Sequence, residues 1–227
     1  MKHNCFWLLL PLFAACGGAP KEMAQPEAID LGLSVKWASF NVGATSPEGF
    51  GNYYAWGIAA TVASNSADNY LYAKLAPDGT PMLWKYCNDT DFGANGFSDK
   101  RTTIEATDDA ATANLGAKWR TPTLDEWKEL ADTANCIWEW TQVNGVSGCK
   151  VTSKKAGFTD KSIFIPAAGF RNNKKVEGDG GTGSYWTASL YEPLPTMAWN
   201  VRFTGDEPEI DSGDRYFGNA IRPVAAE

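Results

Sequence analysis

One short segment of this chain carries a complete helix signal, and it restricts what the remaining sequence can fold into. Thr123 and Glu126 have the spacing of a capping box, in which each side chain accepts a hydrogen bond from the other residue's backbone N–H. Apolar residues recur with the period of one helical face, at Trp127, Leu130, Ala131 and Ala134. We expect a helix from Thr123 to about Asn135 that buries Trp127.

The rest of the chain predicts one further helix and many short strands. Residues 108–115 place two acids ahead of an apolar segment and end just before Gly116, which favours a short helix. Runs rich in β-branched and aromatic residues predict strands at 35–42, 137–141, 149–153, 162–166, 185–189, 198–203 and 220–224. Residues 64–101 are rich in Asn, Asp, Gly and Pro without periodicity, which predicts a long loop. The sequence therefore predicts an α+β fold in one domain.

The N-terminus predicts an export signal rather than part of the fold. Lys2 precedes an apolar run over residues 6–15, which is shorter than the roughly 20 residues that span a bilayer. Two alanines stand directly before Cys16, as in bacterial lipoproteins, whose cysteine is acylated; the alternative is an ordinary secretory signal with a chance cysteine. We therefore expect a signal peptide at 1–15, a tether at 16–28 and a single domain at 29–227, lipid-anchored in the bacterial cell envelope at the outer membrane.

Composition excludes several kinds of chemistry. The only histidine is His3, inside the predicted signal peptide, which excludes Ser-His-Asp catalysis and His-ligated metals from the domain. The chain has 20 basic and 27 acidic residues and a net charge of −7. This balance argues against nucleic acid as a partner, because nucleic-acid binding needs a basic surface.

The cysteines of the predicted domain leave two states open. Cys87, Cys136 and Cys149 are an odd number in an oxidising compartment, which is compatible with one bridge or with three buried thiols. A hairpin turn at residues 144–145 is expected to place Gln142 opposite Cys149, so a bridge from Cys149 to Cys136 would be strained.

Several motifs resemble one family of bacterial domains. Residues 119–127 (WRTPTLDEW) are similar to the signature of the formylglycine-generating-enzyme-like branch of the C-type lectin fold, and residues 218–224 (GNAIRPV) resemble its closing segment. Further matching segments lie at 30–33, 36–38, 54–57, 163–171 and 185–189. Over residues 29–224 the chain looks most like the Fibrobacter succinogenes major paralogous domain. The resemblance implies a C-type lectin-like fold with paired terminal strands, two short helices, a small mainly antiparallel sheet and long loops.

The same resemblance argues against an enzyme. Enzymes of the wider group hold copper on a pair of late cysteines or iron on histidines. This chain has no cysteine after Cys149 and no histidine after His3, so neither activity is carried over to it. A fold of this kind hosts many functions, and the site has to be argued from its own residues.

The late loops are the sequence's best candidates for a binding surface. Residues 192–196 and 204–216 lie between short strands and have no evident structural role, and rigid strands commonly present binding loops. The candidate ligand contacts there are Tyr191, Trp199, Asp211, Arg215 and Tyr216. The acidic run 206–214 offers oxygen ligands for calcium at Glu207, Glu209 and Asp211, with a solvated acidic loop as the alternative.

These observations predict a non-catalytic, lipid-anchored binding protein of the cell envelope that recognises a glycan or a protein through its late loops. The only membrane contact expected is the lipid anchor. One alternative is an enzyme that acts on envelope or dietary polysaccharide through paired carboxylates, with Asp108-Asp109 and Asp125-Glu126 as the pairs in view. The other is a structural subunit of the envelope or of a fimbria.

Overall fold

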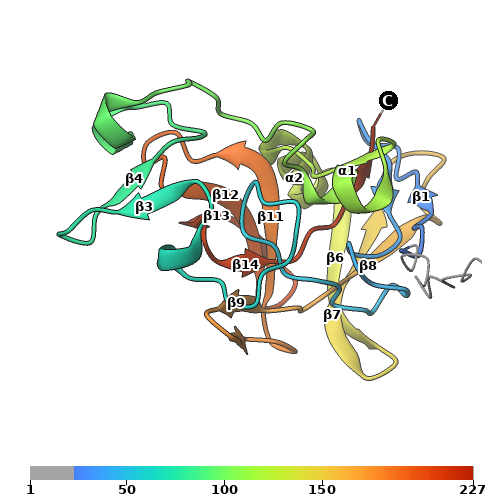
Figure 1. The fold of residues 1–227 in the computed structure, drawn as a ribbon. Coiled ribbons are helices and arrows are strands. Elements are labelled where there is room, and N and C mark those ends of the chain that lie inside the picture. The colour runs from blue at the N-terminus through green and yellow to red at the C-terminus, as the bar shows by residue number, and fades with distance from the viewer. Residues whose placement is uncertain (1–22, 227) are drawn as a thin grey trace, which may run out of the picture.

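The computed structural model describes residues 23–226 (Figure 1). The predicted signal peptide, Cys16 and most of the predicted tether lie outside the described residues. Packing begins before residue 29: Pro26 is buried, and the Ser39 N–H donates to the Glu27 carbonyl over 2.9 Å. No helix within residues 23–226 is long and apolar enough to cross a membrane.

The two predicted helices are present and capped. α1 (Ala110–Leu115) begins after Asp109, whose carboxylate accepts from the Ala111 N–H. α2 (Leu124–Ala131) has both halves of the predicted capping box, and Trp127 is fully buried, as predicted. Three single-turn 3₁₀ helices lie at η1 (Ala67–Asn69), η2 (Thr90–Phe92) and η3 (Ala94–Gly96).

α2 ends earlier than its apolar pattern predicts. The chain leaves helical geometry at Asp132, whose side chain accepts a hydrogen bond from the Ala134 N–H over 2.8 Å. Because this side chain takes an N–H that would otherwise continue the helix, the last turn is not formed and Ala134 is exposed.

The described strands form five small sheets, which confirms the α+β class; wherever two strands pair, they run antiparallel. One sheet contains β1 (Ala28–Ile29), β2 (Trp37–Ala38), β15 (Val224–Ala225) and β5 (Trp119–Arg120). A second contains β6 (Cys136–Val143), β7 (Val146–Ser153) and β8 (Ser162–Pro166). A third contains β10 (Lys175–Glu177), β9 (Phe170–Asn172) and β14 (Gly218–Asn219). The fourth contains β11 (Gly183–Leu190), β12 (Met197–Phe203) and β13 (Pro208–Asp214), and the fifth is the hairpin of β3 (Ala73–Leu75) and β4 (Pro81–Leu83).

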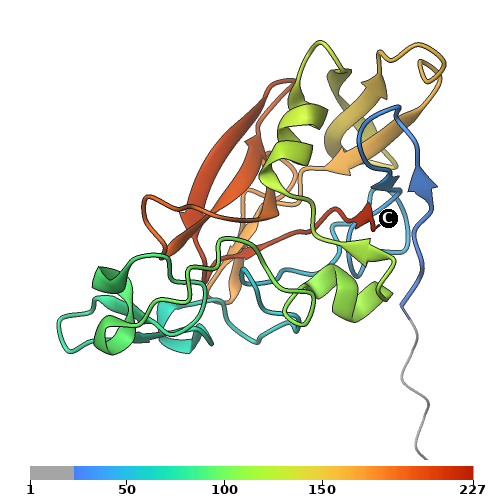
Figure 2. The ribbon, with the colours of Figure 1, turned by 90° about the horizontal axis from the view of Figure 1, so that it is seen from above.

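The ends of the domain are joined in one sheet. Val224 on β15 pairs with Trp37 on β2, which is the terminal pairing that the family resemblance implies. Seen from above, α2 lies between the β6–β8 sheet and the β11–β13 sheet (Figure 2). Trp127 from α2 contacts both Trp37 and Tyr185, so the helix, the terminal strands and the central sheet share one core.

The β6–β7 hairpin corrects one predicted pairing. Asn144 and Gly145 have positive φ of 49° and 81°, as a two-residue hairpin turn requires. Counting from this turn, Trp140 and not Gln142 lies opposite Cys149. All three cysteines of the described chain are unpaired and buried. Burial raises the pKa of Cys136 to about 11 and that of Cys149 to about 12.

Two predicted loops contain regular structure. Residues 64–101 hold the three 3₁₀ helices and the β3–β4 hairpin, which projects from one side of the molecule (Figures 1 and 2). Within the predicted loop 204–216, residues 208–214 form β13, which pairs with β12 over its full length. The acids, proline and glycine of this segment disfavour a strand locally, so the pairing with β12 overrides propensity.

Candidate functional site

Strand alternation separates two of the predicted ligand contacts. Trp199 lies opposite Ser212, whereas Asp211 lies opposite Asn200, so Trp199 and Asp211 face opposite sides of the β11–β13 sheet. Trp199 is half-buried and meets the ring of Tyr191 edge to face, with centroids 4.7 Å apart. The Tyr191–Trp199 pair and Asp211 therefore cannot form one contact surface.

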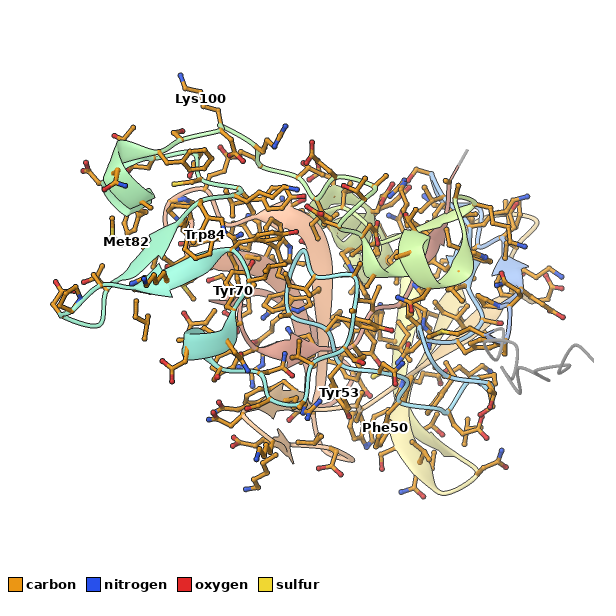
Figure 3. All side chains as sticks on the ribbon, viewed as in Figure 1. Phe50, Tyr53, Tyr70, Met82, Trp84 and Lys100 are labelled. Carbon is orange, nitrogen blue, oxygen red and sulfur yellow. The ribbon has the colours of Figure 1, made fainter. Side chains whose placement is uncertain are left out.

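Arg215 is a structural residue rather than an exposed contact, which corrects its place among the candidates. Its side chain is 1% exposed and its guanidinium donates to Tyr70 Oη over 2.8 Å. Further donations reach the carbonyls of Lys85, Tyr86 and Pro195, and the guanidinium lies over the Tyr70 and Tyr86 rings. Tyr70 lies beside the β3–β4 hairpin (Figure 3). Arg215 thus ties the 64–101 excursion to the end of β13.

Tyr216 is also occupied within the fold. Its hydroxyl donates to the Asp214 carboxylate over 3.0 Å. Burial, together with the negative charge of Asp214, raises the pKa of Tyr216 to about 12. The tyrosine is half-buried, and its hydroxyl is held by a neighbour two residues away.

The acidic run does not assemble a metal centre in the described part of the chain. Asp211 is 3.5 Å from Arg202, and Asp206 accepts from the Trp140 N–H over 2.5 Å. Glu207 and Glu209 are exposed. Within residues 23–226 no three Asp, Glu, His or Cys side chains are grouped closely enough to hold a metal ion.

A pocket of about 100 Å³ lies between the β11–β13 sheet and the β9–β14 pair, and Asp211 is the one predicted contact that lines it. The register places Ser184 opposite Arg202 and Asn200 opposite Asp211, so their side chains leave the sheet on this face. Pairing of Asn219 with Phe170 brings the second wall alongside. The full lining is Phe170, Ser184, Asn200, Arg202, Asp211, Ser212, Gly213, Phe217 and Asn219.

The floor of the pocket is polar and buried. Ser184, Asn200 and Asn219 are 3%, 4% and 2% exposed. The Oδ1 atom of Asn200 is buried and has no hydrogen-bond partner among the described residues. An unsatisfied buried polar group costs about 1–3 kcal/mol of stability, so this position is not optimised for folding.

The pocket stays open because of a glycine. A Cβ on Gly213 would lie 3.0 Å from Asn200 Nδ2 and 3.7 Å from the Trp186 ring. A side chain at this position would therefore crowd the amide and fill part of the space above it.

The rim combines an ion pair with two aromatic rings. Arg202 and Asp211 are each 44% exposed, and the Arg202 guanidinium lies 6.0 Å from the Phe170 ring centroid. Phe170 meets Phe217 edge to face at 5.5 Å. The site thus offers charged donors and acceptors at its mouth, apolar ring surface on one wall, and an unpaired amide at its base.

Two larger hollows are lined in part by polar residues but by none of the buried, unpaired ones of the described chain. One of about 500 Å³ lies beside β8 against Ile29 and Pro47, and one of about 430 Å³ lies between β6 and the start of β13. Among the described residues, none of the buried polar atoms without a partner lines either hollow. Their larger volume alone is therefore no argument that either hollow is the ligand site.

Three of the four carboxylates considered for catalysis are engaged in the fold, whereas Asp125 is 92% exposed and lies 3.4 Å from Lys128 Nζ. Asp109 accepts from the backbone and hydroxyl of Thr121 as well as capping α1, and Glu126 bonds Arg120 at 2.5 and 2.8 Å. Asp108 accepts from Lys85 and from the Tyr86 hydroxyl. Burial alone would raise the pKa of Asp108, but these hydrogen bonds hold it below the ordinary value of 3.8.

Sequence reasoning missed most of this pocket. Alternation within the predicted strand at 198–203 could have placed Asn200 and Arg202 on one strand face, but that signal was not used. The same pattern contained no signal that Phe170 and Phe217 would wall that face. No protein-family model, curated protein or solved structure matches the chain.

Proposed function

We propose that this chain is a non-catalytic binding protein that holds a small polar group of a glycan or protein ligand in the pocket beneath Arg202 and Asp211. The observation that carries the proposal is the buried amide of Asn200, whose Oδ1 has no partner among the described residues and whose Nδ2 lies beside Gly213, on the pocket side. Six other buried side-chain atoms of the described residues also lack a partner, on Trp37, Asn65, Asn88, Trp119 and Thr152, but none of those residues lines this pocket. Oδ1 itself has almost no exposed surface, so the contact open to a ligand is a hydrogen bond donated by Asn200 Nδ2 to a ligand oxygen.

The proposal keeps the predicted class of protein and moves its site. The predicted late loops supply Asp211, but the pocket also needs Asn200 and Ser184 from neighbouring strands and Phe170 from β9. The fold proposed is the C-type lectin-like one, supported by the paired terminal strands and two short capped helices. The proposed location is the outer membrane, through a lipid on Cys16.

Binding is favoured over polysaccharide cleavage by the state of the carboxylates. Glycosidases need two carboxyl groups that face each other across the substrate. Asp109 and Glu126 are already used as caps and ion-pair partners, and the pocket itself presents one carboxylate, Asp211, paired with Arg202. This arrangement can hold a ligand but lacks a free acid and base pair.

A ligand screen on two adjacent variants tests the proposed site. The purified full chain, Asn200→Leu and Trp199→Leu are screened by ligand-observed NMR against soluble glycans and short peptides. Residues 199 and 200 face opposite sides of the same strand. We expect binding that Asn200→Leu abolishes and Trp199→Leu retains. Binding lost only in Trp199→Leu would place the site on the Tyr191–Trp199 side, and a wild-type chain that binds nothing would contradict the proposal.

A further inference from the structure

The charges at the mouth of the pocket select against charged ligands. Arg202 and Asp211 lie on the same side of the sheet, 3.5 Å apart, and both are half exposed at the rim. An anionic group drawn to Arg202 would approach the Asp211 carboxylate, and a cationic group drawn to Asp211 would approach the guanidinium. Each charged ligand therefore gains one attraction and one repulsion, whereas a neutral ligand is not repelled.

The hydrogen-bonding groups alternate between acceptors and donors. The Asp211 carboxylate accepts, the Arg202 guanidinium and Asn200 Nδ2 donate, and the Ser184 hydroxyl can do either. A ligand hydroxyl donates one hydrogen bond and accepts others, so adjacent hydroxyls on a ring match this mixture. An amide or a carboxylate matches only part of it.

The aromatic wall of the pocket requires the ligand to present an apolar surface. Phe170 and Phe217 line the pocket opposite the polar side chains of β12 and β13. A phenyl ring has no conventional hydrogen-bonding group, so the ligand face against it must present C–H groups. A ligand with hydroxyls on its edge and C–H groups on its face is a sugar ring.

The size and closed floor limit how much of a sugar enters. The pocket holds about 100 Å³, against roughly 300–1,000 Å³ for sites that enclose drug-sized ligands. The buried side chains of Ser184, Asn200 and Asn219 close its inner end. One ring can enter with its edge leading, and a chain cannot pass through.

We infer that the pocket binds the uncharged terminal sugar ring of a glycan, end-on, with a ring hydroxyl accepting a hydrogen bond from Asn200 Nδ2. This inference rests on the proposed function and specifies its ligand. Arg202 and Asp211 act in it as a matched pair, since each cancels the attraction that the other would exert on a charged ring. Removing either charge should therefore change which charged sugar is accepted.

The test uses rings that differ only in charge. Methyl glycosides of glucose, galactose and mannose are compared with the matching uronic acids and amino sugars by NMR titration on the purified full chain. We expect at least one neutral ring to bind, with its charged counterparts weaker by about tenfold or more. Asp211→Asn should strengthen binding of the uronic acid, and Arg202→Gln that of the amino sugar. Both substitutions lie at half-exposed positions, so these gains do not depend on whether Asn200→Leu folds.

Chain length tests the end-on geometry. A monosaccharide and the trisaccharide that ends in it should bind within about threefold of each other, because only one ring makes contact. An affinity that rises about tenfold with length would indicate an extended groove and overturn the inference.

The outcomes separate this inference from the proposed function. If a charged ring binds the wild type as tightly as the neutral one, or if peptides bind while all sugars fail, the inference is wrong and the binding function stands, provided that Asn200→Leu removes the binding. If no ligand of either screen binds the wild type, or if Asn200→Leu binds them all unchanged, both proposals are wrong.

Discussion

The same substitution, Asn→Leu, should leave the free energy of unfolding almost unchanged at one buried asparagine and lower it strongly at another. Leucine has the branching and the number of side-chain heavy atoms of asparagine, so Asn→Leu removes polarity with little change in shape. Asn200 has an Oδ1 without a partner among the described residues, whereas Asn41 is fully buried and fully engaged. Asn41 Nδ2 donates to the Phe50 carbonyl and to the Tyr185 hydroxyl, and its Oδ1 accepts from Arg222 Nε over 2.9 Å.

The magnitudes follow from what each substitution leaves behind. Asn200→Leu removes a group whose unsatisfied burial costs about 1–3 kcal/mol, so we expect the free energy of unfolding to stay within about 0.5 kcal/mol of wild type or to rise by about 1 kcal/mol. Asn41→Leu leaves a donor of Arg222 unpaired in the core, and breaking a buried charged network costs about 3–5 kcal/mol. Burial already lowers the pKa of Arg222 to about 10, so this guanidinium depends on its remaining partners, the carbonyls of Ala38 and Phe164.

Urea denaturation of the wild type and both variants measures the difference. The midpoints should separate by an amount that corresponds to about 3 kcal/mol or more, with similar m-values, since the area exposed on unfolding is unchanged. Equal losses in the two variants would refute the reasoning. They would mean that Asn200 Oδ1 has a partner in the folded protein and that its amide is held for stability rather than for a ligand.

Three further predictions concern the fold. Trp127→Ala should destabilise by about 3–5 kcal/mol through loss of a buried aromatic, and Thr123→Ala by about 1 kcal/mol through loss of the cap; denaturant melts that give both the wild-type midpoint would contradict the helix assignment. The folded-state pKa of Asp108 lies below its ordinary value of 3.8, so its carboxylate stabilises the fold above that pH, and this contribution is lost as the pH falls through the folded-state pKa. Asp108→Asn should therefore lose stability at neutral pH and show a shallower acid decline in melts recorded across that range; an unchanged pH profile would be evidence against the paired carboxylate. Burial raises the pKa of all three described cysteines, so an alkylating reagent at neutral pH should label them only in denaturant, and rapid native labelling would contradict their burial.

The sequence by itself determined the elements whose cause is local. The Thr123–Glu126 capping box and the apolar stripe specify α2 because their interactions span one or two turns of the chain. The Asn144-Gly145 turn specifies the β6–β7 hairpin because these two residues tolerate the positive φ that it needs. Runs rich in β-branched and aromatic residues predicted most of the longer strands and the α+β class, but of the predicted strands at 35–42 and 220–224 only residues 37–38 and 224 lie in strands.

Only the tertiary structure decided where β13 lies and which residues share a site. Residues 208–214 have poor strand propensity, and they extend because β12 supplies a partner for their backbone groups. Trp199 and Asp211 are only twelve residues apart in the sequence, but their side chains lie on opposite faces of the sheet. Arg215 was a predicted ligand contact beside an acidic run, yet the Tyr70 hydroxyl and the carbonyls of Lys85 and Tyr86 that hold it come from segments more than a hundred residues earlier.

The pocket shows most clearly that local sequence patterns do not predict contacts between distant residues. Alternation could have placed Asn200 and Arg202 on one face of the predicted strand at 198–203, since this is a local consequence of the backbone. That Phe170 and Phe217 wall this face, and that Gly213 leaves it open, depends on pairing between β9 and β14 and between β12 and β13. These contacts join residues far apart in the chain, and their selection rests on the packing of the whole core, which no short stretch of sequence encodes.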